Sequence, residues 1–301
     1  EFYESLKNTI DSLRLWHGRY LQKLKAMGSP NYEILKNVPF LPPQSFHEAV
    51  QSLWFTFAFT RLTGNWSGIG RIDQMLWGFL KADLEAKRLT IDRAREILAH
   101  FFIKGCEWIR SSPPQSSGDA QHYQNIILSG IDENGQDITN EVTYLVLDII
   151  EELNISDFPV AVRINKNTPH RLLKRISEVI KLGGGVIAVY NEDLVIKSLT
   201  RFGYPLKEAR KFANDGCWEV QIPGKTYFIY HPFDALRILL DSTLCLDGTP
   251  KTYKSMEELY QAFYKNLQSV VEAIYAAEVN SRLEFKNQQW VWKKNAPCTV
   301  V

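Results

Sequence analysis

The sequence predicts an α/β fold in which a layer of helices precedes alternating strands and helices. Up to about residue 110 the apolar residues recur at helical spacing. From residue 111 onward, short apolar runs of strand length alternate with helical stretches, which is typical of a parallel sheet built from βα units. A chain of 301 residues can bury a sizeable core. We therefore expect a helical layer over residues 1–110 and half of a βα barrel over residues 111–301, joined in one continuous domain.

The helical layer is expected to contain four helices. The first is amphipathic and ends near Gly28 and Pro30, and a proline-rich connector follows it. Ser45 and Glu48 have the spacing of a capping box, which predicts the start of the next helix. We expect these helices at about residues 2–26, 45–62, 71–87 and 91–110.

The βα part begins after a loop rich in Ser, Pro and Gly. Its apolar runs predict strands at 125–128, 160–164 and 186–190. Helices are expected at 140–153, 170–182, 192–202 and 206–213, and the segment 214–226 follows at the position of the next strand. Ser255 and Glu258 then open a long helix with one apolar face.

Charge and cysteine content exclude several classes of protein. There are 35 Lys and Arg residues against 34 Asp and Glu residues, so the charge of +1 gives no electrostatic footprint for nucleic acid or an anionic membrane. No apolar run approaches the ~20 residues that span a bilayer. The four cysteines form no CxxC pair and the six histidines form no HExxH motif, so neither a disulfide framework nor a metal site is expected. A reducing, cytoplasmic location fits this composition best.

The segment 214–226 carries the strongest functional signal. Its glycines and proline favour an extended conformation, in which side chains at i and i+2 point the same way. Cys217 and Glu219 would then face one substrate, although a lone cysteine is more often an inert core residue. Gly224, Lys225 and Thr226 do not form a phosphate-binding loop, because Glu219 stands where that loop needs its first glycine. No nucleotide is expected here.

This segment also resembles a known loop. Gly-Cys-x-Glu at 216–219, followed by Gln-x-Pro-Gly-Lys-Thr at 221–226, is similar to the thiyl-radical loop of the glycyl radical enzymes, the pyruvate formate-lyase superfamily. The likeness is greatest to the dehydratase and lyase branch. Further matching motifs follow the family's order: Gly70-Arg71-Ile72-Asp73-Gln74, residues 123–130, Thr139-Asn140-Glu141, Val162-Arg163-Ile164, Thr168-Pro169, residues 182–185 and Tyr190-Asn191.

The resemblance implies a ten-stranded α/β barrel with surrounding helices, of which this chain carries mainly the first half-barrel. It implies an anaerobic lyase in which Cys217 abstracts hydrogen as a thiyl radical and Glu219 is the general base. The glycyl radical would lie on a C-terminal loop that this chain does not contain, and we expect the chain to be incomplete at both ends. A radical S-adenosylmethionine activating enzyme, a small-molecule substrate and a homodimer are the implied partners.

The substrate-binding positions depart from the diol-dehydratase pattern. Where those enzymes read Asn-Gly-His-Ser, this chain ends the motif with Trp66 and Ser67. Where they place His-Asp after the cysteine loop, it has Tyr230 and His231, and Trp218 lies inside the loop itself. These five residues are the predicted substrate contacts. They suit a larger or partly aromatic substrate better than glycerol or propanediol.

Three alternatives remain open at this point. The same radical could serve an arylacetate-type decarboxylase or a formate-acetyltransferase-like C–C lyase. A non-radical thiol enzyme would pair Cys217 with His231 or His122. A structural fragment of a split protein is the third.

Overall fold

The computed structural model describes residues 2–62, 68–106, 124–155, 158–183, 187–216, 218–226, 233–286 and 289–292. These residues form two compact units, Glu1–Pro223 and Gly224–Val301. The first unit holds the sheet and the cysteine segment, so it is described first.

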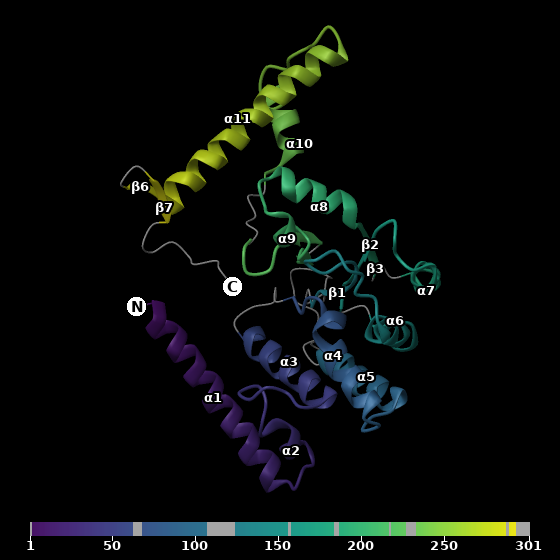
Figure 1. The fold of residues 1–301 in the computed structure, drawn as a ribbon. Coiled ribbons are helices and arrows are strands. Elements are labelled where there is room, and N and C mark those ends of the chain that lie inside the picture. Colours follow the sequence, from purple (N-terminus) through teal and green to yellow (C-terminus); the bar gives the residue numbers. More distant parts are fainter. Residues whose placement is uncertain are drawn as a thin grey trace. The chain divides into compact units, whose positions relative to one another are not determined.

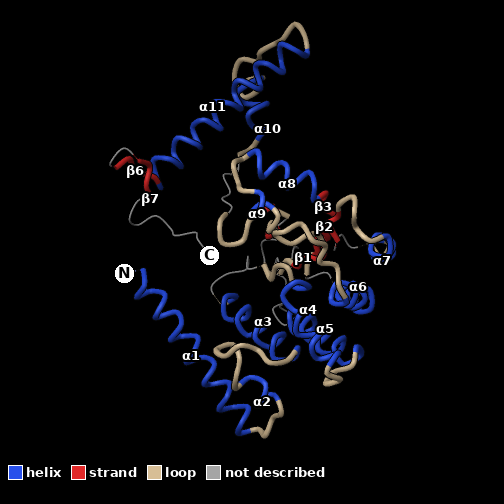
Figure 2. Tube along the Cα trace, viewed as in Figure 1, coloured by secondary structure: helices blue, strands red, loops and turns tan. Residues whose placement is uncertain are grey.

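A three-stranded parallel sheet lies at the centre of the first unit. Its strands are β1 (Ile126–Ser129), β2 (Val160–Ile164) and β3 (Ile187–Asn191), in that order across the sheet. Helix α6 (Glu141–Leu153) connects β1 to β2, and α7 (His170–Ile180) connects β2 to β3. The predicted βα units are therefore confirmed, as Figures 1 and 2 show.

The helical layer packs on one face of this sheet. Apolar side chains at alternate strand positions, such as Ile126, Leu128 and Val162, share one core with the helices. Alternation places these residues on a single face of the sheet. In Figure 1, α4, α5 and α6 gather on that side. The helices of the layer are α1 (Phe2–Ala26), α2 (Asn31–Leu35), α3 (Phe46–Arg61), α4 (Ile72–Glu85) and α5 (Ile91–Gly105).

Side-chain caps explain where the main helices start. The Ser45 hydroxyl accepts a hydrogen bond from the backbone N–H of Glu48 at the start of α3. Thr90 caps α5 by accepting from Arg93 N–H. Asn140 caps α6 in a reciprocal box with Thr143. Each such cap contributes about 1 kcal/mol, and the Ser45 cap was predicted from its spacing.

The other face of the sheet meets a short antiparallel hairpin. Its strands are β4 (Ala213–Asp215) and β5 (Glu219–Gln221). Ala213 packs in a small cluster with Ile127 and Ala161, which point away from the helical layer because of the strand alternation. The hairpin is approached through α8 (Glu192–Arg201) and α9 (Leu206–Ala209). Helix α9 is shorter than predicted, because the chain turns extended at Ala213.

The second unit is mainly one long helix, α11 (Met256–Arg282), as predicted. A short helix, α10 (Ala235–Arg237), continues into a π-helical segment at Ile238–Thr243. Asn266 of α11 donates a hydrogen bond to the Thr243 hydroxyl, which ties the segment to the long helix. Two strands, β6 (Leu283–Lys286) and β7 (Gln289–Trp292), pair antiparallel after α11. The segments in the second unit apart from α11 were not predicted.

Candidate active site

The cysteine segment forms the tip of the β4–β5 hairpin. Asp215 and Glu219 lie directly opposite each other in its register. The intervening turn has left-handed backbone at Gly216 (φ 57°) and Trp218 (φ 108°), and the N–H of Trp218 donates to the carbonyl of Asp215 at 3.2 Å. A positive φ is rare for a residue as large as tryptophan. The turn is therefore held in a conformation that its own local preferences do not favour.

Two side chains from the sheet hold this turn. Asn125, just before β1, donates from Nδ2 to the carbonyl of Gly216 at 3.1 Å. Tyr190, on β3, donates its hydroxyl to the carbonyl of Trp218 at 2.6 Å. Position 217 is thus flanked by two anchored carbonyls, one on each side. Strained backbone persists where surrounding structure over-determines it, often at functional sites.

The turn differs from the single extended strand that the sequence predicts for Cys217 and Glu219. The chain reverses between Gly216 and Trp218 instead. The side chain that register places on the same face as Glu219 is Asp215, on the neighbouring strand. Cys217 itself lies outside the described residues. Its joint orientation with Glu219 stays a prediction.

The hairpin also meets the segment that begins at Gly68, directly after the Trp66 motif in the sequence. A Cβ added to Gly68 would lie 2.8 Å from Oδ1 of Asp215, so the two segments approach closely. The carbonyl of Asn125 accepts hydrogen bonds from the N–H groups of Ile69 and Gly70, which fixes this segment beside the same asparagine. Segments almost 150 residues apart in the sequence therefore converge at Asp215. Trp66 and Ser67, immediately before Gly68, lie outside the described residues.

The electrostatics of the hairpin are set by burial and by its two carboxylates. The pKa of Asp215 is raised to about 6, mainly by burial and less by the negative charge of Glu219, against one backbone hydrogen bond from Gly216. Burial, followed by the charge of Glu219, raises the pKa of Tyr190 to about 12. Tyr190 is therefore a neutral donor at any physiological pH, and Asp215 exchanges its proton close to neutrality.

Several polar atoms around the hairpin have no hydrogen-bond partner in the described part of the chain. They are Oδ1 of Asp215, Oδ1 of Asn125 and both polar atoms of the Asn214 side chain. Asn125 is 0% exposed and Asn214 is 3% exposed. Buried polar groups are almost always paired, so each exception calls for an explanation. Here the exceptions gather around the turn that carries position 217.

The Gly-Arg-x-Asp-Gln motif has a different, structural setting. Asp73 is fully buried and accepts hydrogen bonds from the Ser129 N–H at 2.6 Å and the Thr143 hydroxyl at 2.8 Å. Arg71 donates to the carbonyl of Ile131 at 2.9 Å. Burial raises the pKa of Asp73, with its hydrogen bonds and Arg71 acting against that rise. The motif joins α4 to the end of β1 and the start of α6.

A second buried group holds the chain just before the hairpin. Arg163 and Glu192 form an ion pair in which both side chains are 0% exposed. Arg163 also donates to the carbonyls of Phe212 at 2.9 Å and Arg210 at 2.8 Å, and its guanidinium lies 4.0 Å from the Phe212 ring centroid. Glu192 accepts from the backbone N–H of Ile131 at 2.9 Å. The pair therefore links β1, β2, α8 and the entry to β4.

Some of the predicted site residues lie in the hairpin, and the others lie outside the described residues. Trp218 and Glu219 belong to the hairpin, while Tyr230, His231 and His122 lie outside the described residues, as do Cys217, Trp66 and Ser67. Sequence reasoning missed the roles of Asp215, Asn125 and Tyr190. The signal for Asp215 was present, since it is the carboxylate nearest the cysteine on its N-terminal side and a three-residue turn would oppose it to Glu219.

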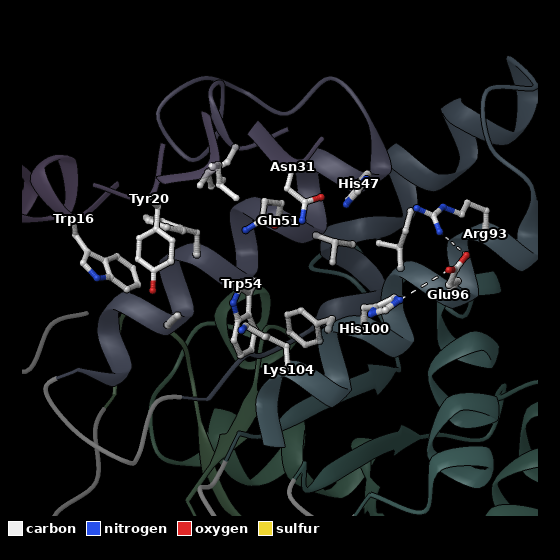
Figure 3. A pocket seen from close by; sticks show the side chains of 17 residues that line it. Trp16, Tyr20, Asn31, His47, Gln51, Trp54, Arg93, Glu96, His100 and Lys104 are labelled. Carbon is white, nitrogen blue, oxygen red and sulfur yellow. Dashed lines mark hydrogen bonds and ion pairs between the residues drawn. The ribbon is translucent and has the colours of Figure 1, made fainter. Parts of the chain in front are cut away.

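A separate cavity lies in the helical layer. It has a volume of about 810 Å³ between α1, α2, α3 and α5 (Figure 3). Its walls are aromatic, with Trp16, Tyr20 and Trp54, and its rim carries the Arg93–Glu96 ion pair. Neither Trp218 nor Glu219 lines it. Within the described ranges no cluster of three metal-ligating side chains occurs, and no helix is long and apolar enough to cross a membrane.

Comparisons with known proteins show which family the chain belongs to. The family model "Pyruvate formate lyase-like" matches residues 1–283. Trans-4-hydroxy-L-proline dehydratase from Clostridioides difficile is 28% identical over 336 aligned positions, which cover 99% of this chain and 41% of that protein. Isethionate sulfite-lyase from Bilophila wadsworthia is 32% identical over 276 positions, covering 85% of this chain and 33% of that protein.

Solved structures of dehydratases are also similar to this chain. The glycerol-bound B12-independent glycerol dehydratase from Clostridium butyricum superposes with a TM-score of 0.76 at 27% identity, covering 87% of this chain and 37% of that one. The hydroxyproline dehydratase from C. difficile, with its substrate bound, gives 0.74 at 29% identity over 83% of this chain and 36% of that one. This chain belongs to the pyruvate formate lyase-like family. Its alignments cover between 24% and 41% of the length of these curated relatives.

Proposed function

We propose that this chain is part of a glycyl radical lyase that eliminates a leaving group from a small organic substrate. The observation that carries the proposal is the anchored hairpin, in which the sheet holds the carbonyls of Gly216 and Trp218, and Glu219 begins the strand that follows. Relatives named as dehydratases and as a sulfite-lyase support elimination as the reaction class.

The radical chemistry needs a cysteine held at a fixed point. When present, the glycyl radical supplies an unpaired electron to the Cys217 sulfur by taking its hydrogen atom. Cys217 then removes a hydrogen atom from a substrate carbon and returns it at the end of the cycle. Hydrogen-atom transfer uses the neutral S–H, so no lowered cysteine pKa is required. Anchoring the turn keeps this short-range transfer in a productive geometry.

Glu219 has the chemistry of the general base. It removes the proton of the hydroxyl on the activated carbon, so that electron density can expel the neighbouring leaving group. It stands at the start of β5, half-buried and fixed by the hairpin register. Trp66, Ser67, Trp218, Tyr230 and His231 are the proposed walls of the substrate site.

The wider setting is proposed on the same basis. The sheet of the first unit would be part of a ten-stranded α/β barrel, with residues 1–110 as its helical layer and residues 111–301 in the first half-barrel. A radical S-adenosylmethionine enzyme would activate the complete protein, which we expect to be a cytoplasmic homodimer. A decarboxylase is the second candidate, because indoleacetate decarboxylase from Tractidigestivibacter scatoligenes is 27% identical over 66% of this chain.

The first prediction tests Cys217 directly. In the complete protein, activated without oxygen, Cys217→Ala should keep the glycyl radical signal in electron paramagnetic resonance but lose all turnover, because the relay to substrate is gone. Cys245→Ala is the matched control, since Cys245 is a free cysteine outside the hairpin. Substantial turnover by Cys217→Ala would falsify the radical mechanism.

The second prediction concerns substrate size. A site lined by hydrogen-bonding groups rejects analogues that cannot pair with it, whereas an aromatic wall discriminates mainly by size. With Trp66 in place of a histidine, glycerol and propane-1,2-diol should be turned over poorly compared with a bulkier hydroxylated substrate. Steady-state assays on both diols check this expectation. Efficient dehydration of either diol would contradict it.

A further inference from the structure

The hairpin carries a second carboxyl group whose surroundings differ from those of an ordinary surface aspartate. Asp215 lies opposite Glu219 in the register, and directly opposed side chains in an antiparallel pair have Cβ atoms about 4.5–5.5 Å apart. Like charges at this spacing repel each other, which disfavours an arrangement with both groups ionised. No ion pair within the described residues compensates the charge of Asp215.

The oxygen of Asp215 that has no partner points to the meeting place of three segments. Oδ1 lies against Gly68, directly after the Trp66 motif in the sequence, and has no hydrogen-bond partner among the described residues. Asn125 holds the next residue of the turn through Nδ2, while its own Oδ1 is buried and unpaired there as well. A half-buried acid beside a buried unpaired acceptor is an arrangement that a hydroxylated ligand would complete.

We propose that Asp215 is the proton donor to the leaving group, working as the partner of Glu219 across the hairpin. This inference rests on the proposed function, to which it adds a second acid–base group. The donor must be within hydrogen-bond reach of the departing atom and must hold a proton near the working pH. The raised pKa of Asp215 meets the second condition, and the hairpin places the two carboxyls on one face for the first.

The proton and electron balance closes without an outside reagent. Cys217 takes a hydrogen atom from the carbon next to the one that carries the leaving hydroxyl, and Glu219 takes the proton of the O–H or N–H group on that activated carbon. The neighbouring C–O bond then breaks, with its electron pair leaving on oxygen, and the proton of Asp215 converts the departing hydroxide to water. The product radical takes a hydrogen atom back from Cys217. Glu219 is left protonated and Asp215 ionised, so one proton returned across the hairpin resets both.

A merely structural Asp215 would behave differently from a proton donor. Loss of a structural group lowers turnover of every substrate by a similar factor, because it displaces the whole turn. Loss of a proton donor matters only where the leaving group needs a proton. Hydroxide needs one far more than fluoride does, because water is a much weaker acid than hydrogen fluoride.

The experiment compares Asp215→Asn with the unaltered complete protein after activation. The probes are trans-4-hydroxy-L-proline, glycerol and propane-1,2-diol, each with the analogue in which fluorine replaces the departing hydroxyl. We expect kcat for hydroxyl loss to fall by about 10²- to 10⁴-fold and fluoride loss to stay within about threefold. Asp193→Asn, an exposed acid in the first turn of α8, is the matched control and should change neither rate.

Two outcomes would overturn the donor role. An equal loss on the hydroxylated and fluorinated probes would make Asp215 structural, while the proposed function would stand. Failure of the proposed function has another signature, because Cys217→Ala would then retain turnover. A substrate-free check uses carbon-13 aspartate labelling: Asp215 should titrate near pH 6, and at lower pH in Glu219→Gln. An Asp215 that titrates near its ordinary value would also overturn the inference.

Discussion

Two pairs of charged side chains in the first unit, one buried and one half-buried, are built in opposite ways. Glu192 pairs with Arg163, a group of opposite charge, and both side chains are fully enclosed. Glu219 faces Asp215, a group of the same charge. In the first pair each charge is compensated by its partner, whereas in the second the two charges repel each other. Arg163 and Glu192 therefore stabilise the fold, whereas the fold keeps Asp215 and Glu219 in an electrostatically unfavourable arrangement.

The surrounding hydrogen bonds strengthen this contrast. Arg163 and Glu192 are joined to the carbonyls of Phe212 and Arg210 and to the N–H of Ile131. Around the hairpin, in the described part of the chain, both polar atoms of Asn214 and one oxygen of Asp215 lack partners. Unpaired buried groups cost free energy of about 1–3 kcal/mol each. Such a cost is tolerated where a ligand or a reaction uses those groups.

Breaking the Arg163–Glu192 pair should have the largest effect on stability. Arg163→Met leaves Glu192 buried without its partner, so the free energy of unfolding should fall by about 3–5 kcal/mol. The double variant Arg163→Met/Glu192→Leu should recover part of this loss, because it removes the uncompensated charge. Urea unfolding measures both. The exposed Arg93–Glu96 pair is the control, and Arg93→Ala should cost less than about 1 kcal/mol. A similar small loss in Arg163→Met would remove the contrast between the two pairs.

Replacing Asp215 should raise the free energy of unfolding at neutral pH, whereas replacing Arg163 should lower it. Because its pKa is raised to about 6 in the fold, the folded state binds the proton more tightly than the unfolded chain. This contribution to stability is present at pH below the ordinary aspartate range and is lost as the pH rises through about 6. At pH 7–8 Asp215→Asn should therefore be more stable than the unaltered protein, by about 1–2 kcal/mol after allowance for partial exposure. Thermal unfolding across pH 4–8 checks the slope, and a variant less stable than the unaltered protein at pH 8 would contradict it.

Much of the fold was predictable because its signals are local. Capping residues such as Ser45 and strand-length apolar runs such as 160–164 are written in a few neighbouring residues, and the structure confirms both. The β4–β5 hairpin was missed although Asp215-Gly216 is a turn-forming dipeptide, because its strands are only three residues long and show no clear alternation of apolar and polar residues. Trp218 adopts its positive φ through the hydrogen bond from Tyr190, a contact that local sequence does not encode.

The site was predictable in part for the same reason. Glu219 follows from its place in the motif, and its strand context is now known. Asp215 needed the register of the hairpin, and Asn125 needed the knowledge that β1 runs beside the turn. Both depend on contacts between segments far apart in the sequence. A pattern of neighbouring residues cannot supply such contacts.

The smallest predicted effect on stability is at Gly68, and it tests how closely the segment at Gly68 meets the hairpin. An added Cβ would lie 2.8 Å from Oδ1 of Asp215, at the end of a side chain that can shift. Gly68→Ala should therefore cost less than about 1 kcal/mol of stability. Displacing a positioned group by about 1 Å can cost up to about 10²-fold in rate, so turnover should fall much more than stability.

The control for Gly68 is a glycine with open space around it. Gly78 lies in α4, and a Cβ there would meet nothing within 4 Å. Gly78→Ala should stabilise the helix by about 0.5–1 kcal/mol and leave turnover unchanged. If Gly68→Ala also left turnover unchanged, the Asp215 side chain could shift without affecting the reaction. The close approach of the two segments would then have no part in the reaction.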